Sequence, residues 1–387
     1  MRNAIVGLLT SLVVFAGAAA PAAAATFWIT TLEALLGLDP DTLEVKKSIP
    51  MGEHQKGALY LMPAPDGRTG YLLTGGREVV SVVDLKDAKV LKSWSLSETS
   101  GGAEDGPKIA RARFYGLALD KAGKRILGHV LTSRRTTSSD LPENAYKLDR
   151  LVLDRPYLAL LDAQTGKRLA TISDAPWATS FVQAMDDPRH PNRFLVISPD
   201  VDIIDLDKLP KGKAPVRAAY KDLLVKHVPL REPKNNGEGT VTVLVEWFHS
   251  EVSKGLGSMP FYGLDPVVGR DRVGVVTVDM VTGAIDPIEI GPPSGLQYAF
   301  STIVSPDRKK AYTIFNLLQE VDLEKRRLGR VETLPYTYYA GNMSPDGSKL
   351  YLYSGGARVA IVDPVTMKIT REVELPSEGW DGLTLPD

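Results

Sequence analysis

Residues 344–364 read SPDGSKLYLYSGGARVAIVDP, and this stretch contains the two signals from which the fold is derived. A Pro-Asp-Gly turn at Pro345–Gly347 leads into Lys349–Tyr353, where strand-forming residues alternate. A second apolar run ends at Asp363, whose carboxylate is placed to accept N–H groups of the turn that follows. The repeating unit therefore consists of a Pro-Asp-Gly turn, a β-strand, and a second β-strand that ends in an aspartate. Similar turns and strand ends recur along the chain.

The apolar run that ends in an aspartate occurs seven times. The aspartates are Asp39, Asp84, Asp162, Asp205, Asp279, Asp322 and Asp363. Four spacings are 45, 43, 43 and 41 residues, which is the period of four-stranded propeller blades. The interval from Asp84 to Asp162 is longer, but its few strand-like pieces favour one blade with inserted loops over two. We interpret all seven aspartates as structural rather than catalytic.

These signals predict an all-β fold, a seven-bladed β-propeller of four-stranded blades. The sequence Trp380–Pro386 resembles the inner-strand openings Phe114–Leu119 and Tyr339–Met343. The C-terminal strand is therefore expected to complete a blade that begins near Thr26, so that N- and C-terminal strands close the ring. The longest helical signal, Tyr220–His227, predicts at most a short helix.

Composition excludes several classes of function. The 46 Lys and Arg residues balance the 47 Asp and Glu residues, so nothing indicates nucleic acid as a partner. The chain contains no cysteine, which excludes disulfides, thiolate metal sites, thioether-attached haem and a cysteine nucleophile. The five histidines show no metal-binding spacing, so no metal site is predicted.

The N-terminus has the pattern of a signal peptide over residues 1–25: a positive start, an apolar stretch and small residues at Ala23–Ala25. Residues 26–387 are then a single propeller domain, exported to the periplasm. No later apolar run is long enough to span a membrane.

Two aromatic segments are candidates for a functional surface. Residues 243–262 combine Trp, Phe, Met and Gly, which suits a loop that covers a concave site or binds a partner. Packing of this loop over its own propeller is an equal alternative. In the second segment, Pro335–Tyr339, the tyrosines either line the mouth of the central channel or pack between blades.

At these residues the chain resembles the β subunit of quinohemoprotein amine dehydrogenase. The resemblance covers nearly the whole mature chain and is densest over residues 243–376. It rests on Trp247 followed by Met259–Tyr262, on Asn316–Lys325 and on Leu334–Tyr339, in that order, with the blade end Val362–Thr366 and Val373–Pro376 after them.

The resemblance implies a cofactor-free, seven-bladed subunit of a periplasmic heterotrimer. Its partners would be a dihaem cytochrome c α subunit and a small γ subunit that carries cysteine tryptophylquinone, and the complex would oxidatively deaminate a primary amine. This chain would hold no catalytic residue. The residues expected to line the pocket or face a partner are Trp247, Phe261, Tyr262, Asn316, Tyr338 and Tyr339.

One feature departs from the family pattern and two alternatives remain open. The insertion over Thr132–Arg155 is longer than in the family, so the resemblance assigns it no docking role.

One alternative is a stand-alone periplasmic propeller of the YVTN type that acts as a binding module. The other is a lactonase-like propeller hydrolase, which would need a central metal site that the sequence does not reveal.

Overall fold

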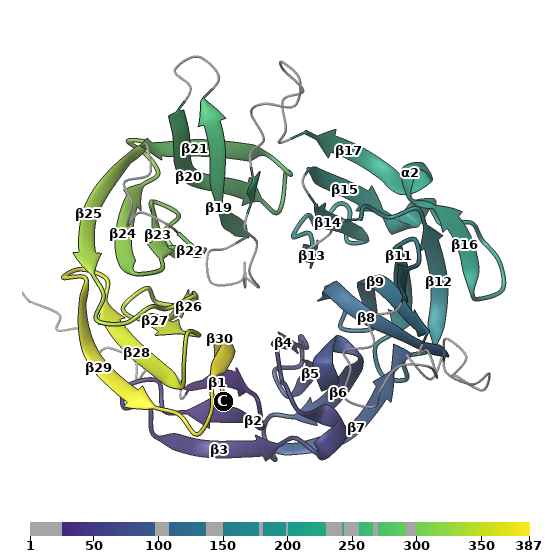
Figure 1. Cartoon of the computed structure of the whole chain (residues 1–387), viewed down its shortest axis with the longest axis horizontal. Helices are drawn as coiled ribbons and strands as arrows, with labels where there is room; N and C mark the ends of the chain where they lie inside the picture. Colours follow the sequence, from purple (N-terminus) through teal and green to yellow (C-terminus); the bar gives the residue numbers. More distant parts are fainter. Residues whose placement is uncertain are drawn as a thin grey trace, which may run out of the picture.

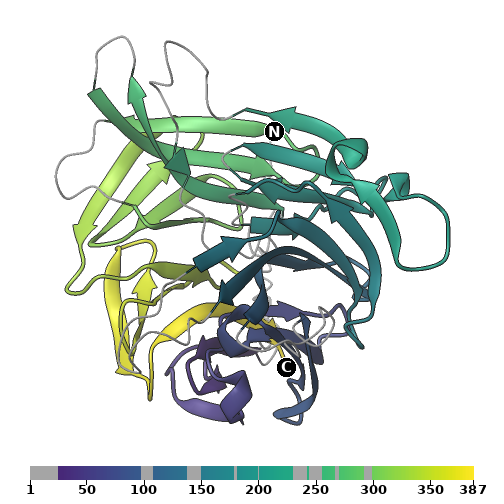
Figure 2. The same cartoon turned by 45° about the vertical axis from the view of Figure 1, so that its right-hand side comes forward.

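A computed structural model describes residues 25–96, 108–136, 150–177, 181–198, 200–229, 242–243, 255–265, 270–291 and 299–387. These residues form seven antiparallel sheets arranged as blades around a common axis (Figure 1). The fold is therefore the predicted seven-bladed β-propeller, and the turned view in Figure 2 shows the sheets stacked side by side around the ring.

The first three blades are built from residues 60–228. Blade 1 consists of β4 (Tyr60–Pro63), β5 (Thr69–Thr74), β6 (Val79–Asp84) and β7 (Lys89–Ser95). Blade 2 consists of β8 (Lys108–Leu119), β9 (Arg125–Thr136), β11 (Tyr157–Asp162) and β12 (Arg168–Ser173). Blade 3 consists of β13 (Phe181–Ala184), β14 (Arg193–Ile197), β15 (Val201–Asp205) and β17 (Leu224–Val228).

The remaining four blades include both ends of the described chain. Blade 4 consists of β18 (Thr242–Val243), β19 (Leu256–Asp265), β20 (Arg270–Asp279) and β21 (Ile285–Gly291). Blade 5 consists of β22 (Ser301–Val304), β23 (Lys310–Ile314), β24 (Leu317–Asp322) and β25 (Arg327–Thr333). Blade 6 consists of β26 (Ala340–Met343), β27 (Leu350–Tyr353), β28 (Arg358–Asp363) and β29 (Lys368–Glu374). Blade 7 consists of β30 (Gly379–Pro386), β1 (Ala25–Thr31), β2 (Ala34–Leu38) and β3 (Val45–Pro50).

Blade 7 closes the ring as predicted, because its inner strand comes from the C-terminus and its other three strands from the N-terminus. The register of β1 and β30 places Ala25 opposite Pro386 and Ile29 opposite Gly382. Gly382 is required here, since a Cβ atom would lie 2.7 Å from the ring of Phe27. Phe27 in turn stacks on Tyr351 of blade 6, with the ring centroids 4.2 Å apart.

Two buried polar side chains connect β30 to the blades on either side. Asp381 accepts a hydrogen bond from the backbone N–H of Leu61 in blade 1, at 2.9 Å. On the other side, the amide of Asn342 in blade 6 donates to the carbonyl of Gly382, at 2.8 Å. These bonds satisfy buried polar groups on three neighbouring inner strands, so they hold blade 7 in place between its neighbours.

All seven predicted aspartates accept backbone N–H bonds from the turn that follows them. Asp363, for example, accepts from Val365 at 2.7 Å and from Thr366 at 3.2 Å, and the other six make equivalent bonds. We call the end of the ring that carries these turns the Asp-turn face. The opposite end, where each blade connects to the next, is the crossover face.

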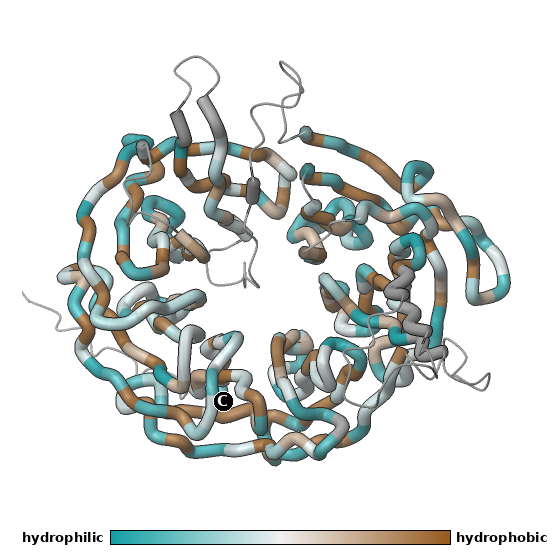
Figure 3. Tube along the Cα trace, viewed as in Figure 1, coloured by the Kyte–Doolittle hydropathy of each residue, from teal (hydrophilic) through white to brown (hydrophobic). Residues whose placement is uncertain are grey.

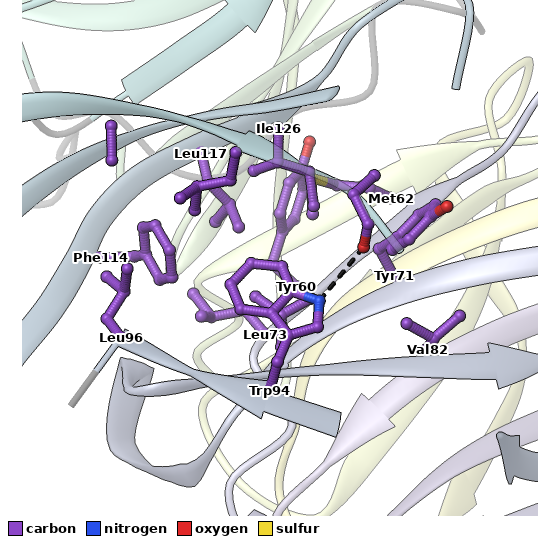
Figure 4. Packing of buried hydrophobic residues seen from close by; sticks show 14 of the residues in the cluster. Tyr60, Met62, Tyr71, Leu73, Val82, Trp94, Leu96, Phe114, Leu117 and Ile126 are labelled. Atoms are coloured by element: carbon purple, nitrogen blue, oxygen red, sulfur yellow. Dashed lines mark hydrogen bonds between the residues drawn. The ribbon is translucent and has the colours of Figure 1, made fainter. Parts of the chain in front are cut away.

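Apolar side chains fill the spaces between successive blades. In the cluster between blades 1 and 2, Trp94 packs near Tyr60, Leu73 and Phe114 (Figure 4). Its indole Nε1 donates to the carbonyl of Ala163, at 3.1 Å, so the polar end of the ring is satisfied. The outer strands β3, β25 and β29 instead mix hydrophilic and hydrophobic residues, and most of their residues are exposed or partly exposed (Figure 3).

Blade 2 has two extra strands, and the connection between the last two strands of blade 3 carries extra elements. In blade 2, β10 (Arg150–Leu153) pairs with the far end of β9, and β16 (Val216–Ala219) adds as a parallel strand beside β12. The sequence between Asp84 and Asp162 is thus one blade with insertions, as predicted. The helix expected at Tyr220–His227 is shorter: α2 covers Tyr220–Leu223, and the residues after it pair with β15 as β17.

Three short 3-10 helices complete the described structure: η1 (Glu53–Gln55), η2 (Gly75–Arg77) and η3 (Leu206–Lys208). No helix among the described residues has the length and apolar character needed to cross a membrane. The predicted signal peptide lies outside the described residues apart from Ala25, and it stays a prediction.

Replacing Asp381 tests the ring closure. Asp381→Ala removes the acceptor for the buried N–H of Leu61, so we expect the free energy of unfolding to fall by about 1–3 kcal/mol. Asp381→Asn keeps an acceptor oxygen at the same place. Its free energy of unfolding should therefore fall by less than half as much as that of Asp381→Ala. Thermal and chemical unfolding followed by circular dichroism measures both, and equal losses in the two variants would contradict the assigned bond.

The buried side chain of His129 predicts a pH dependence of stability. Its Nε2 lies 2.9 Å from the carbonyl oxygen of Pro176, and burial lowers the pKa of His129 to about 4. An unfolded chain titrates near the ordinary value of 6.5, so between these values the unfolded state binds more protons than the folded state. Stability should therefore fall by roughly 1–3 kcal/mol as the pH drops from 7 to 4. His129→Leu should flatten that slope in denaturant titrations across this range.

Candidate functional site

The structure describes five of the six predicted site residues and places them in blades 4 to 6. Phe261 and Tyr262 lie in the half of β19 nearer the crossover face, and Asn316 lies in the turn between β23 and β24. Tyr338 and Tyr339 precede β26. Trp247 lies outside the described residues, so its role stays a prediction.

Two of the five residues are buried between blades. Phe261 belongs to the cluster between blades 3 and 4, and its ring covers Gly274 so closely that a Cβ there would lie 2.2 Å from it. Tyr338 belongs to the cluster between blades 5 and 6, and its hydroxyl donates to Glu372 Oε2 at 2.8 Å. Burial, together with this carboxylate, raises the pKa of Tyr338 well above its usual value. These two side chains support the blades.

Tyr339 belongs to a partly exposed aromatic patch, which we define as Phe300, Phe315 and Tyr339. The ring of Tyr339 meets Phe300 edge-on at 4.8 Å and Phe315 at 5.4 Å, and the two phenylalanine rings are 6.3 Å apart. Edge-to-face pairs of this kind each contribute about 0.5–1.5 kcal/mol beyond their buried area. The patch is therefore a preorganised apolar surface at the crossover face.

Polar contacts hold the segments around this patch in place. The hydroxyl of Tyr262 donates to the carbonyl of Ala299 at 2.6 Å and accepts from its N–H at 2.5 Å, which ties blade 4 to the start of blade 5. Thr337 donates to Oδ1 of Asn316 at 2.5 Å. The N–H of Tyr338 donates to the carbonyl of Phe315 at 3.1 Å. Tyr262 and Asn316 therefore fix the chain segments that carry the aromatic rings.

The sequence reasoning missed Phe300 and Phe315. Phe300 immediately precedes β22, Phe315 immediately follows β23, and Ser301 pairs with Ile314. The register of this hairpin would have placed the two phenylalanines next to each other. Tyr339 joins them from the next blade, and no spacing within the sequence indicates that contact.

Several buried polar side chains lie at the boundary between blades 4 and 5. Among the described residues, the apolar cluster at this boundary has five buried members: Val275, Ile288, Val304, Ala311 and Val321. Next to them Thr302 donates to Ser258 at 2.8 Å, and the register aligns Thr302, Thr313 and Gln319 across blade 5. Gln319 is 1% exposed, and neither polar atom of its amide group has a hydrogen-bond partner among the residues that the structure describes. Such a buried group weakens this boundary.

A cavity of about 360 Å³ lies at the Asp-turn face, on the opposite side of the ring. It is formed where the inner strands of blades 7, 1, 2 and 3 end, and its lining includes Tyr60, Met62, Leu119, Gln183 and Leu385. Two charged residues that border it are paired elsewhere: Asp120 with Arg125, and Lys121 with Asp186. The lining is therefore mainly apolar.

The titratable side chains do not converge on a metal site within the described part of the chain. No group of three His, Asp or Glu side chains is placed there to hold a metal ion. His129 is buried inside blade 2, whereas His227 Nδ1 lies 2.7 Å from Asp202 in blade 3. The central metal site of a lactonase-like hydrolase is thus not found among these residues.

The fold and the site define a seven-bladed β-propeller with an aromatic patch at one face and an apolar cavity at the other. No family model matches the sequence, and no curated protein matches it either. Solved structures resemble this chain in fold.

Three of these structures have the same general architecture. A dihydro-haem d1 dehydrogenase, NirN, in complex with DHE is 15% identical, with a TM-score of 0.51 over 92% of this chain and 74% of that chain. Hydrazine synthase of Kuenenia stuttgartiensis is 12% identical, with a TM-score of 0.51 over 91% and 92%. Apo AztD of Citrobacter koseri is 17% identical, with a TM-score of 0.50 over 94% and 98%. At these identities the likeness concerns the fold alone.

The polar boundary between blades 4 and 5 predicts that Gln319→Leu stabilises the protein. The substitution removes two buried polar atoms that have no partner among the described residues, so the free energy of unfolding should rise by about 1–3 kcal/mol. Gln319→Glu should lower it, because a buried carboxylate without a partner costs more than an amide. Urea unfolding measures both changes, and destabilisation by Gln319→Leu would show that the amide has a bonding partner in solution.

Proposed function

We propose that this chain is the cofactor-free β-propeller subunit of a periplasmic quinohemoprotein amine dehydrogenase. The proposal rests first on the ordered resemblance over residues 243–376, which implies a seven-bladed propeller. The observed fold agrees with that implication, although many other proteins share this fold. The comparisons with solved structures contribute the fold and carry no information on the reaction.

The observation that carries the proposal is the aromatic patch at the crossover face. Three partly exposed rings are held together there by ring contacts of 4.8–6.3 Å, and two of the residues implied by the resemblance, Tyr262 and Asn316, hold the segments that carry them. Well-packed aromatic groups with one side exposed are favourable anchors for a partner protein. We assign the patch to the contact with the small quinone-bearing γ subunit.

The chemistry of the reaction explains the division of roles among the subunits. Oxidation of a primary amine needs an electrophilic carbonyl, a base and an acceptor for two electrons. With no cysteine, this chain forms neither cysteine tryptophylquinone nor covalently attached haem c, so in the proposed complex the γ and α subunits supply them. The propeller then acts as a scaffold. Its apolar face helps to enclose the hydrocarbon part of the amine and to exclude water.

The proposed location is the periplasm, because residues 1–25 have the pattern of a signal peptide.

A stand-alone binding module of the YVTN type is the second candidate function. It is favoured by the apolar cavity of about 360 Å³ at the Asp-turn face, which has the size of a small-molecule site. Neighbouring genes separate the two candidates: a dihaem cytochrome c and a small Cys- and Trp-containing polypeptide support the dehydrogenase.

Reconstitution with the α and γ subunits tests the proposal through Tyr339. Tyr339→Ala removes the ring that joins Phe300 to Phe315, so we expect the affinity of assembly to fall at least about tenfold. Tyr339→Phe keeps the ring and should assemble normally. Binding is measured by calorimetry, and amine-dependent dye reduction reports activity.

Tyr336→Ala provides a matched control in the same segment. Tyr336 is exposed, and its ring lies 4.2 Å from the guanidinium group of Arg358, so we expect its loss to leave assembly unchanged. Thermal unfolding of each variant shows whether the ring is intact. Wild-type assembly by a folded Tyr339→Ala variant would contradict the site assignment, and amine-dependent turnover by the isolated chain would contradict the scaffold role.

A further inference from the structure

The cavity at the Asp-turn face is bounded by the ends of four inner strands. The last residues of these strands, Pro63 of β4, Leu119 of β8, Ala184 of β13 and Pro386 of β30, all line it. The strands are the innermost ones of blades 1, 2, 3 and 7 (Figure 1). The shape of the cavity is therefore set by how four blades are placed in the ring, and not by one loop.

Contacts within and between the blades hold the walls of this cavity in place. The turn of blade 1 packs on that of blade 2 so closely that a Cβ on Gly123 would lie 2.7 Å from the ring of Pro65. Asp120 accepts two backbone N–H bonds from the turn that follows it, at 2.8 Å and 3.1 Å. The bond from Leu61 to Asp381 fixes β30 against β4. The cavity is therefore preformed, which lowers the cost of binding a ligand.

Both charged side chains in the lining of the cavity are already paired. Asp120 accepts from Nε of Arg125 at 2.7 Å, and its side chain is 2% exposed. Lys121 forms an ion pair with Asp186. Gln183, which also lines the cavity, has an uncharged amide. A carboxylate or ammonium group that entered the cavity would therefore lose its water without gaining a free partner of opposite charge.

Apolar side chains form most of the remaining wall. Tyr60 and Met62 lie two residues apart on β4, and each is 3% exposed. Leu119 on β8 and Leu385 on β30 lie on either side of this strand, and both are partly exposed. A ligand that covers the two leucines removes apolar surface from water, and the flexible thioether of Met62 adapts to its shape. The wall is therefore suited to an apolar molecule.

We propose that the cavity at the Asp-turn face binds a neutral, largely apolar small molecule with one or two rings. The volume of about 360 Å³ lies near the lower end of the range for small-molecule sites, which sets this size. The paired charges and the apolar wall select a neutral ligand. This inference rests on the second candidate function, the binding module, and names its ligand class. It does not depend on the amine dehydrogenase proposal, whose aromatic patch lies at the opposite face.

Three probes that share one apolar body and differ in charge test this site. They are naphthylmethanol, naphthoate and naphthylmethylammonium, and their binding to the protein is measured by titration calorimetry. We expect naphthylmethanol to bind at least about tenfold more tightly than either charged probe. Leu119→Trp places a larger side chain in the cavity and should weaken its binding at least about tenfold. The control Leu91→Trp adds the same ring on the outer strand β7, where Leu91 is 51% exposed, and should stay within about twofold of the wild type.

Each other outcome overturns the ligand class, the site or the binding module itself. A charged probe that binds as tightly as naphthylmethanol would overturn the neutral ligand class and leave the binding module standing. Wild-type affinity in a folded Leu119→Trp variant would show that the probe binds elsewhere. Absence of binding by all three probes would overturn both the inference and the binding module that the cavity favours. If Leu119→Trp does not fold, Leu385→Trp fills the cavity from β30 and repeats the comparison.

Discussion

The pairing of β30 with β1 is the contact on which the rest of the molecule depends. A propeller blade buries both of its sides against neighbouring blades, so one missing inner strand exposes two boundaries at once. Asp381 and Asn342 extend this closure to both neighbours through hydrogen bonds to Leu61 and Gly382. The blade-end aspartates then need only organise local turns, because the closed ring sets the positions of the strands.

The boundaries between blades differ in character. The boundary between blades 1 and 2 is filled by a large apolar cluster around Trp94. Among the described residues, the boundary between blades 4 and 5 has a smaller apolar cluster and contains the buried amide of Gln319, which has no partner there. The aromatic patch joins blades 5 and 6 at the crossover face, and Tyr262 ties blade 4 to the segment that leads into blade 5. Apolar packing is thus distributed unevenly around the ring.

The sequence was sufficient to predict the blades, because each turn needs an aspartate at a fixed offset from a buried strand. It was not sufficient for the site. Tyr338 and Tyr339 are adjacent in the chain, yet one is buried against Glu372 and the other joins the exposed patch, because successive residues point to opposite sides as the chain enters β26. Phe300 and Phe315 were missed because a hairpin register brings them together.

The strand order of blade 7 also has a consequence for the order of events during biosynthesis. The strands β1, β2 and β3 are the first described part of the chain to be made, but their inner neighbour β30 is the last. Until residues 379–386 emerge, the edge of β1 has no partner, and the ring can adopt only an open form. Closure therefore joins residues that are some of the most distant in the described sequence, which makes it a slow step that follows the synthesis of residues 379–386. During that interval the edge of β1 is open to pairing with other chains.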